Sequence, residues 1–208
     1  MNKQFIFLTA LFAMNSVMAE VINGCAIRSG TLCVEKNLQG ADLQGADLAR
    51  ANFLQSNLSR ANLQGANLLN ANLHLTNLNE ANLKDAMLDK ADLKNTTLVE
   101  AKLNQAHLNN AHLKSADLTQ ADLSGAHLQG ADLSGANLTM ARFQDANLQR
   151  ADLSGTVMTN TNFRGADMRG VKLGSATLQG ADLRGAILDG IDFNNANTKG
   201  CLGCPTLD

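Results

Sequence analysis

Hydrophobic residues recur along most of this chain with a period of five. Thirty-two consecutive pentapeptides are centred on positions 38, 43, 48 and so on to 193, without one slip. The central residue is Leu in 26 of them, Phe in four and Met in two. The residue two positions earlier is Ala in 24 of them, and the residue between is usually Asn or Asp. Each unit therefore reads apolar, polar, apolar, followed by two variable residues.

Neither regular secondary structure has this period. On an α-helix five residues advance by about 500°, so successive leucines would scatter around the cylinder. On a strand an odd period would place successive leucines on opposite faces. The pattern is satisfied if the chain turns a corner in every pentapeptide, because each short side then directs its Ala and Leu inward. No single coil can bury such residues, so stacked coils must supply the core, as in a β-solenoid.

The repeated motif, A-[DN]-L-x-x, resembles that of the pentapeptide-repeat family, with copies such as ADLQG, ANLQG, ADLSG and ADLRG. The resemblance covers residues 36–195. It implies an all-β fold, a right-handed quadrilateral β-helix of about eight coils with four pentapeptides in each. It also implies that the central residue and the residue two before it are buried. Residues 20–35 and 196–208 are then expected to form small caps.

The first nineteen residues differ from the repeats and predict a secretory signal peptide. Lys3 precedes an apolar run over residues 5–14, and the small-residue pattern Val17-Met18-Ala19 predicts cleavage after Ala19. We therefore expect a protein of the periplasm or the extracellular space. A lipoprotein is less favoured, because Cys25 lies far past the apolar run. No other apolar run is long enough to span a bilayer.

Composition narrows the partner class only weakly. The formal net charge of the 208 residues is −2, and it would be −3 after loss of Lys3. Neither value predicts a polyanionic or polycationic partner. The chain has no Trp, no Tyr and one Pro, so a core of leucine and small residues is expected.

Four cysteines flank the array, two before it and two after it. Export favours disulfides over free thiols. Eight coils at ~4.8 Å each would separate the array ends by roughly 38 Å, whereas disulfide-linked Cα atoms lie within about 7 Å. We therefore predict the pairs Cys25–Cys33 and Cys201–Cys204. A redox role for the C-x-x-C pair is less favoured, because no thioredoxin-like pattern surrounds it. Structural zinc is not favoured either, since the two pairs lie at opposite ends.

Three histidines are metal-ligand candidates. His107 and His127 are twenty residues apart and would be neighbours in one outward column, while His112 would lie on the next side of the same coil. Adjacent imidazoles can bind a transition metal. No carboxylate is expected beside them in that column, so a polar surface ladder is the favoured interpretation.

Other outward residues are candidates for a binding surface. Arg164 and Arg184 would stack, with Arg142 on the same side and Arg169 close by, as a small basic patch. An apolar docking spot near one corner of the first two coils, and a threonine column of the kind seen in ice-binding solenoids, are further possibilities. The residues are Leu54, Leu69 and Leu75 for the first and Thr119, Thr139 and Thr159 for the second.

No nucleophile–base pair and no pocket emerge from the pattern, so we expect neither an enzyme nor a cofactor. The favoured function is a protein-binding or scaffolding surface outside the cytoplasm. Alternatives are a DNA mimic that binds DNA gyrase or another topoisomerase, which the resemblance implies, and an envelope or lumenal structural protein without a dedicated ligand. Nucleic acid is not expected as a partner. Open strand edges at the ends would also permit an end-to-end dimer.

Overall fold

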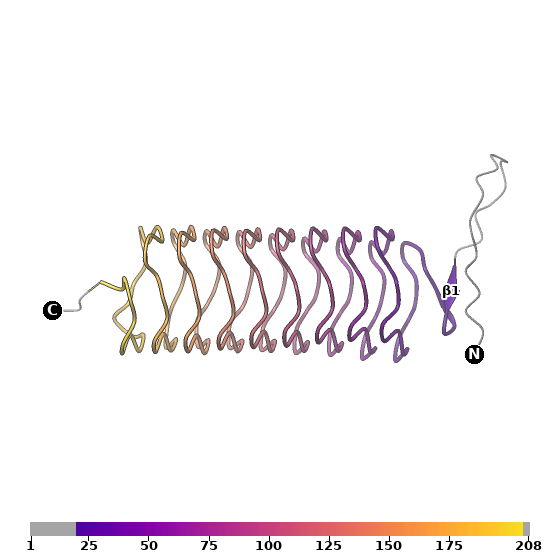
Figure 1. Ribbon diagram of the computed structural model, residues 1–208, viewed down its shortest axis with the longest axis horizontal. Helices are drawn as coiled ribbons and strands as arrows, with labels where there is room; N and C mark the ends of the chain where they lie inside the picture. The colour runs from indigo at the N-terminus through magenta and orange to yellow at the C-terminus, as the bar shows by residue number, and fades with distance from the viewer. Residues whose placement is uncertain (1–19, 206–208) are drawn as a thin grey trace.

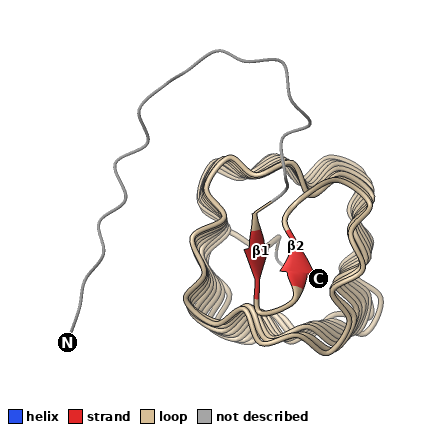
Figure 2. Ribbon diagram, turned by 90° about the vertical axis from the view of Figure 1, so that its right-hand side faces the viewer, coloured by secondary structure: helices blue, strands red, loops and turns tan. Residues whose placement is uncertain are grey.

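The computed structural model describes residues 20–205, which wind into a right-handed, four-sided β-helix of stacked coils (Figures 1 and 2). Parallel bridges join residues twenty apart, beginning with Leu32–Asn52 and ending with Asp182–Leu202. Each coil therefore contains four pentapeptides, as the resemblance implies. The predicted signal peptide lies outside the described residues. Within residues 20–205 no helix is long and apolar enough to cross a membrane.

The four sides are named here A to D in chain order, by the residue that makes the bridge. Side A contains Asn57, side B Asn62, side C Asn67 and side D Asn72, and the members of each side recur every twenty residues. The ladder of bridges extends beyond the predicted bounds of 36–195. Residues on either side of these bounds also form bridges, although they lack the Ala and Leu pattern of the repeat.

Each corner is a tight turn. The N–H of Ala41, for example, donates to the C=O of Leu38 at 3.0 Å. The residue before the donor has a positive φ whether it is Gly40 (67°) or Arg60 (60°), as position i+2 of a type II turn requires. The Asn or Asp before the centre accepts from the N–H two residues on, as Asn57 Oδ1 does from Ser59 at 3.0 Å. The polar position of the repeat therefore stabilises the turns.

The inward positions form one continuous core. Leucines at the centres and alanines two residues earlier are almost wholly buried along the array. Three of the residues that replace Ala are threonines whose buried hydroxyls donate to carbonyls 23 residues earlier, at 2.6–2.7 Å. They are Thr76, Thr96 and Thr161. These bonds satisfy polar groups that burial would otherwise destabilise. Phe143 and Phe163, twenty residues apart in the sequence, stack in one column with ring centroids 5.1 Å apart.

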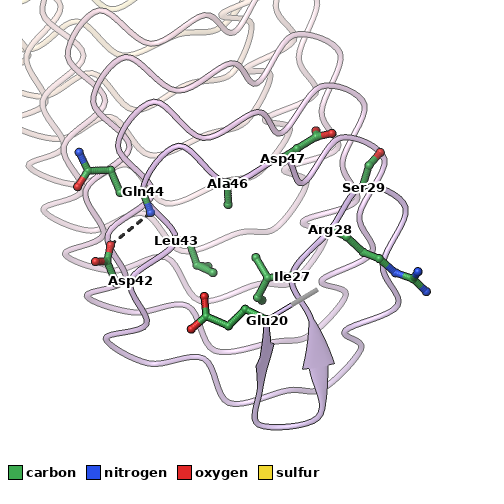
Figure 3. A pocket seen from close by; sticks show the side chains of 9 residues that line it. All are labelled: Glu20, Ile27, Arg28, Ser29, Asp42, Leu43, Gln44, Ala46 and Asp47. Atoms are coloured by element: carbon green, nitrogen blue, oxygen red, sulfur yellow. Dashed lines mark hydrogen bonds between the residues drawn. The ribbon is translucent and has the colours of Figure 1, made fainter. Parts of the chain in front are cut away.

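A β-hairpin lies across the N-terminal opening of the solenoid (Figure 2). Strand β1, Val21–Ile22, pairs antiparallel with β2, Cys25–Ala26. Asn23 and Gly24 make the turn with φ values of 49° and 75°, which is the preferred chemistry of a two-residue hairpin loop. Asn23 Nδ2 also donates to the C=O of Asn37 at 2.6 Å, fixing the hairpin to the first coil. Beside the hairpin a cavity of about 500 Å³ lies open (Figure 3).

Side D of the last coil departs from the regular ladder. No bridge joins Lys172 to Asp192, although the corresponding bridges form along the rest of that side. Val171 and Ile191 occupy inward positions that are Ala from residue 51 to residue 151 on this side, and Phe193 is the next centre. A cavity of about 340 Å³ lies here, lined in part by Val171, Lys172 and Asp192.

Both predicted disulfides are present and no cysteine is free. Cys25 and Cys33 are fully buried between the hairpin and the first coil. Cys201 and Cys204 are partly exposed in the last coil, where Gly203 between them has a φ of 81°. A Cβ on Gly203 would lie 2.8 Å from the backbone nitrogen of Arg184, so this close approach requires glycine.

Candidate functional site

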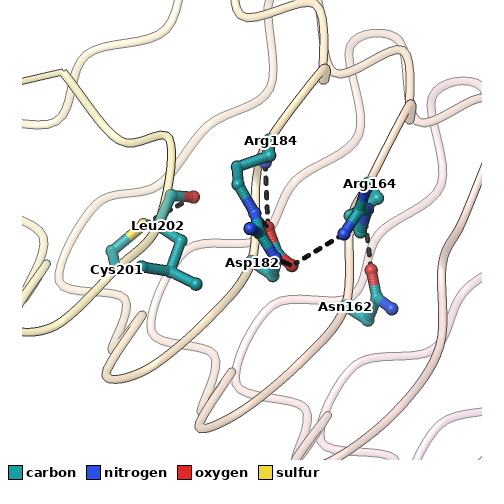
Figure 4. Close-up of polar contacts among 6 residues, drawn as sticks. All are labelled: Asn162, Arg164, Asp182, Arg184, Cys201 and Leu202. Atoms are coloured by element: carbon teal, nitrogen blue, oxygen red, sulfur yellow. Dashed lines mark hydrogen bonds and ion pairs between the residues drawn. The ribbon is translucent and has the colours of Figure 1, made fainter.

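The four predicted arginine candidates do not form a free basic patch. Arg184 pairs with Asp182 at 2.6 Å, and Arg164 lies 3.9 Å from the same carboxylate (Figure 4). The hydrogen bond from Arg184 holds the pKa of Asp182 down, at about 2. This part of side B therefore carries compensated rather than uncompensated positive charge.

The remaining two arginines are paired in the same way. Arg169 donates to Asp167 at 2.6 Å, and this bond holds the pKa of the Asp167 carboxyl well below its usual range. Arg142 lies 4.0 Å from Asp122 in the preceding coil. Because these pairs are exposed, they contribute little stability, but they neutralise the surface locally.

The histidines are not brought together as a metal centre. His107 and His127 stack on side C with ring centroids 4.8 Å apart, as their spacing predicted. His112 belongs to side D, beyond the turn at residues 109 and 110, and so faces another direction. Among residues 20–205 no group of three or more His, Cys, Asp or Glu side chains is arranged to hold a metal ion.

The three leucine candidates do not share one corner. Leu54 and Leu75 lie in the turns between sides D and A, whereas Leu69 lies in the turn between sides C and D. The prediction of a common corner was wrong for Leu69, because it follows the centre of a different side. Leu75 and Leu69 are 46% and 39% exposed and Leu54 is half-buried, so no continuous apolar patch forms.

A charge-free surface lies on side A in the C-terminal half. Three seven-residue segments stack there, and each comprises one stretch of side A with its flanking turns. They are SGANLTM at 134–140, SGTVMTN at 154–160 and GSATLQG at 174–180, and none contains a charged residue. We call these three segments the uncharged patch. The intervening residues 141–153 and 161–173, on the other sides of the same coils, carry four charges each.

Two polar side chains of the uncharged patch form hydrogen bonds with each other or with the coil below. Thr139 Oγ1 donates to Asn137 Oδ1 at 2.7 Å, and Asn137 Nδ2 donates to Thr119 Oγ1 at 2.9 Å in the coil below. Two larger apolar side chains project from the same area, Met140 at 51% and Val157 at 42% exposure. The result is an uncharged surface of mostly small, neutral polar side chains with two larger apolar ones.

Sequence reasoning missed this patch because the three segments are separated along the chain by charged ones. Writing the sequence in rows of twenty residues places them in one block, and that arrangement is the signal that could have found them. Only the threonine column within and beside the patch was recognised. Its first two hydroxyls, of Thr119 and Thr139, donate to neighbouring side chains, Asp117 and Asn137, rather than remaining free.

Comparison with known families agrees with this geometry. The model of the family described as pentapeptide repeats matches in eight copies, over residues 37–74, 56–95, 66–105, 101–139, 136–174 and 176–197. The chain belongs to the pentapeptide-repeat family. No curated protein matches this pentapeptide-repeat chain significantly in sequence.

Several solved pentapeptide-repeat structures are similar to the chain. HetL from the cyanobacterium Nostoc, involved in heterocyst differentiation regulation, is 32% identical over 84% of this chain and 87% of its own, with a TM-score of 0.48. A protein of the Arabidopsis thaliana thylakoid lumen is 33% identical over 46% of this chain and 63% of its own, with a TM-score of 0.35. QnrB1, a plasmid-mediated fluoroquinolone resistance protein, is 20% identical over 77% and 90%, with a TM-score of 0.41.

Proposed function

We propose that this pentapeptide-repeat protein is a non-enzymatic, exported solenoid that binds another protein through the uncharged patch. The observation that carries the proposal is the segregation of charge: three stacked coils place every charged residue outside segments 134–140, 154–160 and 174–180.

The patch has the properties of a contact surface between proteins. Interface cores are depleted of charged residues, because burying a charge without a partner is costly. Small side chains lose little rotamer entropy on contact, and Met140 supplies an adaptable apolar group. The ladder beneath holds the surface rigid, so little backbone ordering is needed on binding.

Other features support export and disfavour the alternative of DNA mimicry. Two disulfides join all four cysteines, as is usual in oxidising compartments. A DNA mimic needs a strongly acidic surface, whereas carboxylates such as Asp122, Asp167 and Asp182 are each paired with an arginine. Pentapeptide-repeat proteins are generally structural or binding proteins, in agreement with a binding role.

The proposal is tested by affinity capture from the extracytoplasmic fraction, with cross-linking and mass spectrometry. The variants Met140→Glu and Val157→Lys place charges in the patch at repeat positions where Glu100 and Lys172 already occur, so the fold should persist. We expect the wild type to capture a protein whose cross-links map to the patch, and both variants to lose it. His127→Lys, at the same repeat position as Val157 but on side C, should retain it. Capture by all four proteins alike, or by none, would contradict the proposal.

A further inference from the structure

The N-terminal edge of the solenoid is unpaired on sides B and C. In the second coil, Asn62 donates its N–H to Ala41 at 2.9 Å and accepts from the N–H of Leu43 at 2.7 Å. The equivalent N–H and C=O groups of Asp42 and Asp47 in the first coil have no hydrogen-bond partner among residues 20–205. A regular ladder thus ends in a row of free donors and acceptors, which is a template for another strand.

The cavity of about 500 Å³ adjoins this edge, and its volume is typical of ligand pockets. Its lining combines an apolar floor with an acidic rim. Ile27, Leu43 and Ala46 supply the floor, and Glu20, Asp42 and Asp47 supply the rim. Arg28 also lines the cavity, but its side chain extends away from Asp42 and Glu20 (Figure 3). The crevice therefore combines free backbone groups, apolar surface and net negative charge.

The two rim aspartates have unused binding capacity. Asp42 Oδ1 accepts from Asn62 Nδ2 at 2.9 Å and from the N–H of Gln44 at 3.3 Å. Asp47 Oδ1 likewise accepts from Asn67 Nδ2 in the next coil at 2.9 Å and from the N–H of Ala49 at 3.3 Å. Neither Oδ2 has a hydrogen-bond partner, and neither carboxylate has an ion pair, within residues 20–205. Five aspartates at the same repeat position in later coils do form an ion pair: Asp92, Asp122, Asp152, Asp167 and Asp182.

We propose that this crevice binds an extended, basic peptide segment of another protein as an added parallel strand. The strand would donate N–H groups to the carbonyls of Asp42 and Gln44 and accept from the N–H of Asp42. Alternate side chains of a strand point to opposite faces. One set would then contact the apolar floor at Leu43 and Ala46, while basic residues of the other set reach the rim carboxylates. This site is separate from the uncharged patch and does not depend on it.

The probe is the acetylated, amidated peptide Lys-Val-Lys-Val-Lys, titrated calorimetrically into the exported protein, whose N-terminus is determined by mass spectrometry. We expect it to bind and the matching Glu-Val-Glu-Val-Glu peptide not to bind. Two further probes are N-methylated, one at its lysines and one at its valines. Because N–H groups of a strand alternate in direction, one of these should bind at least about tenfold more weakly than the other. Equal affinities would overturn strand pairing.

Matched variants test whether the rim carboxylate of Asp42 contributes to peptide binding. In Asp42→Asn the Oδ1 that closes the turn is retained, as Asn62 shows, and the lysine peptide should bind about threefold more weakly. Asp132→Asn changes the same repeat position on side D, where the carboxylate has no ion pair among the described residues, and should bind as the wild type does. Equal loss in both variants, or no binding of the lysine peptide by the wild type, would overturn the proposal.

Hydrogen exchange separates a foreign strand from the chain's own residues. The amide of Asp42 should exchange fast in the free protein and slowly with the lysine peptide bound. Slow exchange without any peptide would show that the protein itself fills the crevice, and would overturn the proposal of a separate partner.

Discussion

The two ends of the solenoid are closed by different structures. At the N-terminus a hairpin of non-repeat sequence, β1 and β2, lies across the opening and buries the Cys25–Cys33 disulfide. At the C-terminus the array ends in a coil whose side D has lost its bridge and whose disulfide, Cys201–Cys204, is partly exposed. Both ends are cross-linked, but only the first has its disulfide within the core.

The difference indicates that stability is graded along the molecule. In a solenoid each coil is stabilised by its neighbours, so a terminal coil depends on whatever covers it. Leu188 and Ile191 near the C-terminus are only partly buried, whereas the equivalent positions in the central coils are fully buried. We therefore expect the last coil to open first and the hairpin end to resist opening.

The largest predicted effect compares a leucine at each end. Leu43 is 2% exposed beneath the hairpin, whereas Leu188 is partly buried. Leu43→Ala should lower the free energy of unfolding by about 3 kcal/mol, and Leu188→Ala by about 1 kcal/mol. Urea denaturation measures both, with the central Leu128→Ala as a control that should match Leu43→Ala. Equal losses of unfolding free energy in Leu43→Ala and Leu188→Ala would contradict the difference in stability between the two ends.

The disulfides provide the next test. Thiol–disulfide exchange requires access to a sulfur atom. The partly exposed Cys201–Cys204 bond should therefore be reduced by dithiothreitol at least about tenfold faster than the buried Cys25–Cys33 bond. Timed alkylation followed by peptide mass spectrometry gives both rates in one sample. Faster reduction of the N-terminal bond would show that the hairpin opens before the last coil.

A smaller effect is expected at the junction of hairpin cap and array. Ser56 donates its hydroxyl to the C=O of Cys33 and accepts from the N–H of Lys36 at 3.0 Å. Ser56→Ala should cost about 1 kcal/mol and speed hydrogen exchange in the N-terminal cap only. Ser56→Thr, which keeps a hydroxyl as Thr76 does one coil later, is the control and should restore most of the loss.

The smallest predicted effect is a loss of stability at acidic pH. Because Arg184 holds the folded pKa of Asp182 at about 2, below the ordinary 3.8, the pair stabilises the folded state fully above about pH 5. This contribution is lost progressively as the pH falls from about 5 to 1. Asp182→Asn should therefore lower Tm slightly at pH 6 and by much less at pH 2. A difference of the same size at pH 2 as at pH 6 would mean that the carboxylate charge is not its cause.

The period of five with inward Leu and Ala predicted a β-solenoid, whereas its four sides were predicted from the resemblance to the pentapeptide-repeat family. The disulfides followed from the separation of the array ends. The hairpin was missed because only six residues encode it, although Asn23-Gly24 between Val21-Ile22 and Cys25-Ala26 is a recognisable turn signal.

Surface chemistry was less predictable than the core. The arginines were identified, but their pairing depends on which aspartate lies within reach in space. The side chains of Arg164 and Asp182 meet only because neighbouring coils stack. Open edges at the ends of the array were expected, but not that the N-terminal one lies on sides B and C, because register alone does not show that the chain leaves the coil for a hairpin at residues 21–26.

The most direct test of the central claim is site-specific photocross-linking in cells that produce the protein from its full-length gene. A photoreactive amino acid replaces Val157 in the uncharged patch or, as the matched control, His127 at the same repeat position on side C. We predict a discrete adduct with another protein from position 157 and none from position 127. No adduct from position 157, or the same adduct from both, would contradict the assignment of the uncharged patch as the partner-binding surface.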